Sequence, residues 1–497
     1  MTMLSRRAML ALTTTAGVLA ACQTPTDPPC CMPEPDALGD LDATGVAAHI
    51  RAGRITASEA LEAAIARSER LNGQLNFIAT PLHDYGRARA GGQLSGPFAG
   101  VPTLIKDLMP MVGHPTQYGS RAFATYVPQE QPPYMDALLA AGLVPFGKST
   151  TPEFGLTATT ETLLGGDTLN PWDTSRSSGG SSGGAAVAVA ARVVPIAHAS
   201  DGGGSIRIPA SCNGLVGLKP SRDRTVPTGR PQPFEISVNG CVSRSVRDTA
   251  AWLAATEATG AGAAYPPNGL VTGPNTQRLR IIVDIPNALG NEPDPEVRRA
   301  VEDAAELCRS LGHDVREQRA SIDGPQFTED FILLWADGAA EVVTLVQSQA
   351  PGAPLDALLE PLTIELAAHA RARGPDALRA AIGRLRAVEA QYASMFETAD
   401  IYLTPVLAKP PVPLGQISGA RGMAAFETLS DYVGYTPLQN VAGAPAISLP
   451  LGWSSTGLPI GIHFAAAKGQ EKRLLEVAYE LEQARPWAAR KPGVNAG

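Results

Sequence analysis

The sequence has few aromatic side chains and no long run of charge of one sign. Phe, Trp and Tyr make up 5% of its 497 residues, and 40 basic residues stand against 48 acidic ones. A surface that binds nucleic acid normally gathers Lys and Arg, so this pattern argues against nucleic acid as a partner. Cysteines with metal-ligand spacing are also missing, because Cys212, Cys241 and Cys308 are far apart. We expect Cys308 to be a buried structural thiol.

The N-terminus has no apolar stretch long enough to cross a membrane. Arg6 and Arg7 precede an apolar run, residues 8–21, which is shorter than the roughly 20 residues of a spanning helix. Such a pattern is typical of a signal peptide. The run ends in Leu19-Ala-Ala-Cys22, which resembles a bacterial lipobox, and Ser5-Arg-Arg7 resembles a twin-arginine export signal. An ordinary secretory signal with a chance Cys22 is the alternative.

These signals predict the organisation of the chain. We expect residues 1–21 to be a signal peptide and residues 22–37 to hold the lipidated Cys22 and a Pro-rich tether. Residues 38–490 then form one large domain, followed by a tail at 491–497. The protein is expected on the periplasmic side, anchored to a membrane through its lipid. The choice between inner and outer membrane and the oligomeric state, for which a homodimer is one alternative, stay open.

The domain shows helical patterns that alternate with short buried strands. Helices are predicted after the capping box Thr56-Ala-Ser-Glu59, after Asp294-Pro295, and over 364–396 and 469–484. The predicted strands are 101–105, 143–146, 193–196, 279–283, 401–403 and 446–449. This alternation predicts an α/β layered fold.

Two segments match known motifs by letter, but the residues around them argue against both matches. Gly142-Leu-Val-Pro-Phe-Gly-Lys-Ser149 fits a phosphate-binding loop by letter, but its apolar interior favours a buried strand. Gly180-Ser-Ser-Gly-Gly184 fits a nucleophile elbow, in which Ser182 would work with a later His and an Asp. No strand precedes it, so a Ser-His-Asp esterase remains an alternative only. A binding lipoprotein without turnover is the other alternative.

Residues 175–209 are the most unusual part of the chain, because two Gly/Ser clusters flank one short apolar segment. In the second cluster, Asp201-Gly-Gly-Gly-Ser205, three glycines allow a tight turn that exposes several N–H groups beside a serine. Exposed amides beside a nucleophile are what an oxyanion hole requires. The pair of clusters therefore points to a catalytic serine.

The spaced motifs resemble those of the amidase signature family over roughly residues 38–490. They are Gly100-Val-Pro-Thr-Leu-Ile-Lys106-Asp107, Gly179-Gly-Ser-Ser-Gly-Gly184, Asp201-Gly-Gly-Gly-Ser-Ile-Arg-Ile-Pro209, Asn440-Val-Ala-Gly-Ala-Pro445 and Gly457-Leu-Pro-Ile-Gly461. The resemblance implies one large α/β domain with a mixed, mostly parallel β-sheet covered by helices on both faces. It also implies hydrolysis of a small-molecule amide, with no metal and no organic cofactor.

The resemblance assigns roles to single residues. It implies that Ser205 is the nucleophile, that Ser181, entered through a cis peptide bond from Gly180, carries the proton, and that Lys106 is the base. A lysine is a base only when neutral, so burial must lower its pKa by several units from about 10.4. The apolar residues before Lys106 make such a dry site reasonable.

Further residues are expected to support this centre. The N–H groups of Gly202, Gly203, Gly204 and Ser205 would hold the oxyanion, and Ser182 would orient the network. Asp201 and Arg207 would form a structural pair that holds the loop. Gly96-Pro-Phe-Ala-Gly-Val-Pro102 and Asn170-Pro-Trp172 resemble the branch of the family that contains 6-aminohexanoate-cyclic-dimer hydrolase.

Overall fold

The computed structural model describes residues 36–228 and 234–497, which form one compact unit. The predicted signal peptide and Cys22 lie outside the described residues. The strands are β1 (Ile78–Pro81), β2 (Pro102–Lys106), β3 (Val144–Ser149), β4 (Glu161–Thr162), β5 (Gly166–Asp167), β6 (Ile196–Asp201), β7 (Val216–Lys219), β8 (Val238–Ser243), β9 (Arg280–Val283), β10 (Asp314–Glu317), β11 (Ile401–Pro405), β12 (Ala446–Trp453) and β13 (Pro459–Ala465).

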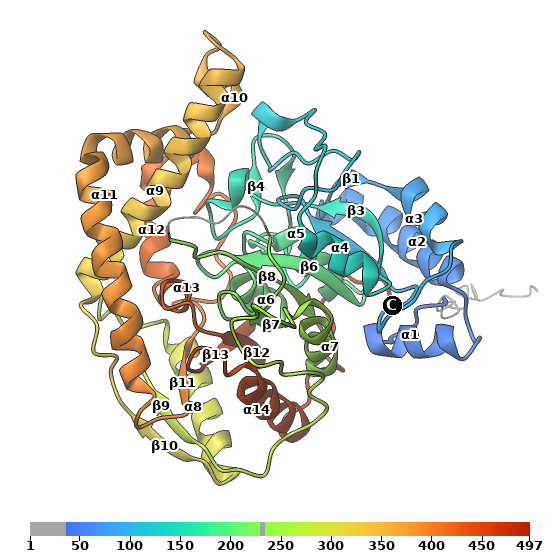
Figure 1. The fold of residues 1–497 in the computed structure, drawn as a ribbon. Coiled ribbons are helices and arrows are strands. Elements are labelled where there is room, and N and C mark those ends of the chain that lie inside the picture. Colours follow the sequence, from blue (N-terminus) through green and yellow to red (C-terminus); the bar gives the residue numbers. More distant parts are fainter. Residues whose placement is uncertain (1–35, 229–233) are drawn as a thin grey trace, which may run out of the picture. The chain divides into compact units, whose positions relative to one another are not determined.

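Helices surround these strands (Figure 1). They are α1 (Ala43–Arg51), α2 (Ala57–Leu75), α3 (His83–Ala90), α4 (Pro133–Ala140), α5 (Gly183–Ala190), α6 (Arg207–Asn213), α7 (Val246–Thr256), α8 (Pro295–Ser310), α9 (Gly324–Gln349), α10 (Leu355–Leu358), α11 (Pro361–Met395), α12 (Met423–Tyr432), α13 (Pro437–Val441) and α14 (Glu471–Ala484), with short 3₁₀ turns η1 (Arg121–Phe123), η2 (Glu153–Gly155) and η3 (Gly419–Arg421).

The core is a mixed sheet, as the sequence predicts, but its parallel content is lower than expected. The large sheet has the order β10-β9-β11-β13-β12-β7-β8-β6. Among the described strands, only the pairs β10/β9 and β9/β11 of this sheet are parallel, and its other pairs are antiparallel. The expectation of a mostly parallel sheet is therefore wrong. The reason is that several connections lack a crossover helix, as in the tight hairpin between β12 and β13.

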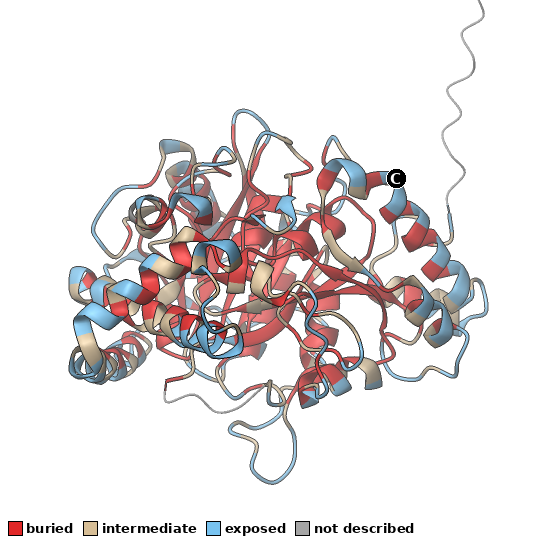
Figure 2. Ribbon diagram, turned by 90° about the horizontal axis from the view of Figure 1, so that it is seen from above, coloured by how far each residue is buried: buried red, intermediate tan, exposed pale blue. Residues whose placement is uncertain are grey.

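Helices cover both faces of the large sheet, and Figure 2 shows that its central strands are buried. Apolar residues of α7, α8 and α14 pack together with those of the sheet on one face, and Cys308 is buried there as predicted. On the other face, α6 lies against β7 and β13. A Cβ atom at Gly461 would lie 2.6 Å from the Cβ of Ser211, so glycine is required for this close packing.

The three-stranded sheet β1-β3-β2 continues this core toward the N-terminal helices. Strand β2 pairs with β3 and lies beside β6, where the Thr103 hydroxyl donates to the Ile196 carbonyl at 2.9 Å. The ends of β2 and β6 are therefore neighbours, although many residues separate them in the sequence. This adjacency places the candidate site.

Several predicted elements are confirmed and others are shifted. Thr56 and Glu59 form a complete capping box at α2, and Asp294 caps α8. The strand predicted at 193–196 instead begins at Ile196, because the buried residues before it belong to the turn that leaves α5. Helix α9 was not predicted. Of the described helices it alone is long and apolar enough to cross a membrane, and it packs against α11.

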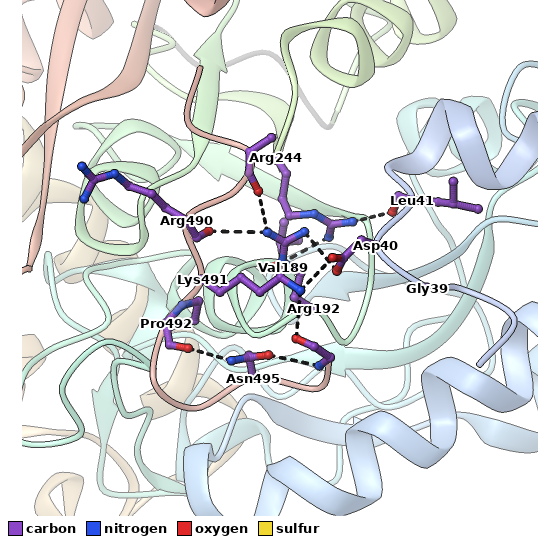
Figure 3. A network of polar contacts seen from close by, with 12 residues as sticks. Gly39, Asp40, Leu41, Val189, Arg192, Arg244, Arg490, Lys491, Pro492 and Asn495 are labelled. Atoms are coloured by element: carbon purple, nitrogen blue, oxygen red, sulfur yellow. Dashed lines mark hydrogen bonds and ion pairs between the residues drawn. The ribbon is translucent and has the colours of Figure 1, made fainter. Parts of the chain in front are cut away.

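The C-terminal residues are fixed to the N-terminal part of the unit by buried arginines (Figure 3). Arg192 donates to the Ala488 carbonyl at 2.8 Å and forms an ion pair with Asp40 at 3.5 Å. Arg244 donates to the Leu41 carbonyl at 2.5 Å, and Lys491 binds Asp40 at 2.7 Å. The two ends of the compact unit therefore meet at one polar network.

We expect Arg192→Met to lower the free energy of unfolding by about 2 kcal/mol, because it removes the charged hydrogen bond to the Ala488 carbonyl and the ion pair with Asp40. Arg309→Met is the matched control, since Arg309 forms only an exposed pair with Glu306, and its effect should stay under about 0.5 kcal/mol. Urea unfolding followed by circular dichroism measures both. Equal effects of the two substitutions would contradict a stabilising role for the network.

Candidate active site

Three loops bring the predicted site residues together. Lys106 is the last residue of β2, Ser181 lies two residues before the start of α5, and Ser205 lies between β6 and α6. Lys106 and Ser182 are completely buried, Ser181 is 2% exposed and Ser205 is 8% exposed. The Gly180–Ser181 peptide bond is cis, as expected.

The Lys106 amine has hydroxyl partners and no carboxylate partner among the described residues. Its Nζ lies 2.7 Å from Ser181 Oγ and 3.0 Å from Ser200 Oγ, with the Ser200 carbonyl at 3.4 Å. Burial lowers the pKa of Lys106 to about 7, although the charge of Asp201 acts in the opposite direction. Near neutral pH a large fraction of this amine is therefore unprotonated and can accept a proton from Ser181.

Ser205 is placed at the mouth of a cavity, and its hydroxyl has no hydrogen-bond partner among the described residues. The predicted contact between the hydroxyls of Ser205 and Ser181 is thus not made in this structure. Catalytic hydrogen bonds are often long before substrate binds. The free hydroxyl beside a cavity is available to attack a bound carbonyl carbon.

The Gly-rich loop, Asp201-Gly-Gly-Gly-Ser205, is held by hydrogen bonds to the Asp201 carboxylate. This carboxylate accepts the N–H of Gly204 at 2.7 Å and that of Ile206 at 3.2 Å. The amides of Gly202, Gly203 and Ser205 have no partner among the described residues. They remain free to bind a developing oxyanion, whereas the amide of Gly204, also expected to do so, is engaged by Asp201.

The predicted pair of Asp201 and Arg207 is present and fully buried. The guanidinium donates to both carboxylate oxygens at 2.9 Å, and it also reaches Asn440 at 2.7 Å and His463 at 3.0 Å. Burial would raise the pKa of Asp201, but the charge and hydrogen bonds of Arg207 hold this pKa well below its usual value. The pair therefore stays ionised and fixes the loop.

The Ser182 hydroxyl is bound to the backbone of Ser200. Its Oγ donates to the Ser200 carbonyl at 3.2 Å and accepts the Ser200 N–H at 3.3 Å. Of the histidines, His198 binds the backbone N–H of Lys106 and the side chain of Asn239. No described histidine contacts Ser182, so the geometry does not support the Ser-His-Asp alternative.

Ser200 and His198 are the site residues that the sequence reading missed. Both lie on β6, at the edge beside β2, where they contact the side chain or the backbone of Lys106. Burial lowers the pKa of His198 to about 3, so its imidazole is neutral and accepts the Lys106 N–H. Their positions just before Asp201 were the only available signal, and knowing that β2 lies beside β6 was needed to use it.

The segment that fits a phosphate-binding loop by letter is buried strand, as expected. Lys148 on β3 is completely buried, and its Nζ contacts the Met109 carbonyl at 2.6 Å and Asp107 at 3.5 Å. In the described part of the chain, no cluster of three His, Cys, Asp or Glu side chains could hold a metal.

Comparison with known proteins gives consistent matches over nearly the whole chain. The amidase family model matches residues 59–475. A Mycobacterium leprae protein named as an amidase, AmiC, is 44% identical over 91% of this chain and 97% of its own length. The 6-aminohexanoate-cyclic-dimer hydrolase of Paenarthrobacter ureafaciens is 36% identical over 91% of this chain and 96% of that protein. A solved structure of 6-aminohexanoate cyclic dimer hydrolase with substrate has a TM-score of 0.82 and 33% identity, covering 92% of this chain and 99% of that one.

Labelling of Ser205 by a fluorophosphonate should depend on the charge of Lys106. Below pH 7 the neutral fraction of this amine, and with it the labelling rate, rises about tenfold per pH unit, and above pH 7 the rate levels off. Lys106→Met should abolish this dependence, whereas Lys468→Met, which removes a partly exposed amine paired with Glu389, should keep it. A wild-type rate that does not change between pH 5 and 9 would contradict the assignment.

Proposed function

We propose how this chain, which belongs to the amidase family and is an amide hydrolase, uses its buried centre to cleave the amide C–N bond. The observation that carries the proposal is the contact of 2.7 Å between Lys106 Nζ and Ser181 Oγ, two buried side chains. A serine hydroxyl is a weak nucleophile until a base removes its proton. A neutral Lys106, acting through Ser181, supplies that base.

The first half of the reaction forms an acyl-enzyme. Lys106 takes a proton from Ser181, Ser181 takes the proton of Ser205, and Ser205 Oγ bonds to the amide carbonyl carbon. The N–H groups of Gly202, Gly203 and Ser205 hold the negative oxygen of the tetrahedral intermediate. When the intermediate collapses, the C–N bond breaks and Ser181 returns a proton to the leaving nitrogen.

The second half repeats the same proton path with water. Water loses a proton toward Ser181 and attacks the ester carbonyl, and the bond to Ser205 Oγ then breaks. The products are a carboxylic acid and an amine, and Ser205 recovers its proton. The reaction balances with water as the only co-substrate.

The relatives also support a proposal on the kind of substrate. The likeness to 6-aminohexanoate-cyclic-dimer hydrolase supports a carboxamide or a linear or cyclic amide of a small molecule as substrate. A homodimer stays a prediction, to be tested by light scattering.

Ser205→Ala should reduce amide turnover by at least about 10³-fold, since it removes the nucleophile and leaves only binding and oxyanion stabilisation. Tryptic mapping of a fluorophosphonate adduct should find it on Ser205 in the wild type. The control is Ser182→Ala, which changes a neighbouring buried hydroxyl and should still be labelled on Ser205. An adduct on Ser182 would contradict this mechanism.

The N-terminal signals support a further proposal on location. We propose that the protein is exported, cleaved before Cys22 and held on the periplasmic side of a membrane by a lipid on that cysteine. The Pro-rich residues after Cys22 would act as an extended tether.

Mass spectrometry of the mature N-terminus should find a diacylglyceryl group on Cys22. Cys22→Ala should release the protein from the membrane fraction while its amide turnover after detergent extraction stays unchanged. An unmodified N-terminus that begins at another residue would refute lipidation.

A further inference from the structure

A cavity opens directly at Ser205, which is one of the residues that line it. The cavity lies between the Gly-rich loop, η2, α9 and α12. Figure 1 shows α9 and α12 beside the long helix α11. The apolar lining of the cavity includes Leu156, Ile208, Ile332, Phe426, Leu429 and Val433. An acyl group bound in this cavity would have its carbonyl carbon at Ser205.

Three aromatic side chains on one face of α9 form the long wall of this cavity. The rings of Phe327 and Phe331 are 6.2 Å apart and 20° from parallel, and those of Phe331 and Trp335 are 5.6 Å apart and 27° from parallel. The Trp335 Nε1–H donates to the Leu156 carbonyl at 3.3 Å, which ties this wall to the loop around η2.

This aromatic wall, Phe327, Phe331 and Trp335, reaches the candidate oxyanion loop. A Cβ atom at Gly203 would lie 3.3 Å from Phe331 Cζ, and one at Gly202 would lie 3.4 Å from the Trp335 ring. The Thr436 hydroxyl fixes the same loop by donating to the Gly203 carbonyl at 2.7 Å. An acyl group attached to Ser205 therefore has an aromatic surface beside it.

The cavity provides no charge for a substrate to pair with. None of the described residues that line it is acidic or basic, and its polar side chains are hydroxyls such as those of Thr157, Thr328 and Ser430. On α9 itself, Asp330 is buried and paired with Arg384 at 2.6 Å. The pair of Asp284 and Arg319, at 3.1 Å, belongs to a neighbouring cavity. A charged acyl group would lose water here without gaining a partner.

From this lining we propose that the cavity is the acyl-binding site for uncharged, apolar acyl groups, so that the substrates are neutral amides of apolar carboxylic acids. The inference rests on the proposed function of Ser205. Substrates whose acyl chain ends in a carboxylate or an ammonium group are discriminated against, because transfer into the cavity removes their hydration.

Four amides of matched size test the inference on the wild-type enzyme. Hexanamide has an apolar acyl chain, 6-aminohexanamide adds a terminal ammonium group, and the monoamide of hexanedioic acid ends in a carboxylate. N-hexylacetamide moves the apolar chain to the leaving amine. We expect kcat/KM for hexanamide to exceed that for each of the other three by at least about tenfold.

A positive charge placed in the cavity should weaken the preference for hexanamide over the amide that ends in a carboxylate. Thr328→Lys brings an ammonium group to the lining, so we expect the ratio of kcat/KM for the monoamide of hexanedioic acid to that for hexanamide to rise at least about tenfold. Thr344→Lys is the matched control, because both threonines donate to a carbonyl one helical turn earlier on α9 at 2.8 Å. Thr344 is exposed and does not line the cavity, so the ratio should stay at the wild-type value.

The outcomes separate the inference from the proposed function. Equal or better turnover of a charged amide by the wild type, or preference for N-hexylacetamide, would overturn the inference and leave the amidase mechanism intact. Absence of turnover for all four amides, together with no adduct on Ser205, would contradict the proposed function as well.

Discussion

The structure depends on one buried amine that lacks a carboxylate in contact. Lys106 sits at the end of β2, and among the described residues its amine hydrogen-bonds only to hydroxyl and carbonyl groups. Burial lowers its pKa to about 7. A directly bound carboxylate would keep the amine protonated and would remove its use as a base. The position of β2 beside β6 and that of Ser181 before α5 place hydroxyl and carbonyl groups around this amine without adding a negative charge.

Two carboxylates near the Lys106 amine, those of Asp201 and Asp107, are paired with other cations. Asp201 is held by Arg207, and on the other side Asp107 forms a pair with Lys148 at 3.5 Å. Arg207 holds the Asp201 carboxylate, which binds the N–H groups of Gly204 and Ile206 and so shapes the oxyanion loop. The same pair leaves the amides of Gly202, Gly203 and Ser205 free, while burial is what lowers the pKa of the Lys106 amine.

Much of this could be predicted from the sequence, because glycine clusters and spaced motifs are local signals. The α/β class and the two Gly/Ser loops follow from such signals, whereas the resemblance to the amidase signature motifs pointed to Lys106, Ser181 and Ser205. Contacts between distant segments did not follow. Ser200 and His198 matter because β6 lies beside β2, and the antiparallel order of the large sheet depends on connections that periodicity does not reveal. Helix α9 was missed although Asp323 caps it and Pro325 lies in its first turn, and this helix supplies the aromatic wall.

The charge state of Lys106 is the claim on which the mechanism stands. NMR titration of protein labelled with ¹³C at the lysine Cε atoms would follow it directly, with Lys106→Met used to assign its signal. The pKa of Lys219, also buried, is lowered to about 7 as well, so the assignment by substitution is essential. The account predicts a Lys106 signal that titrates with a pKa of about 7. A Lys106 signal that stays protonated until pH 10 would contradict it.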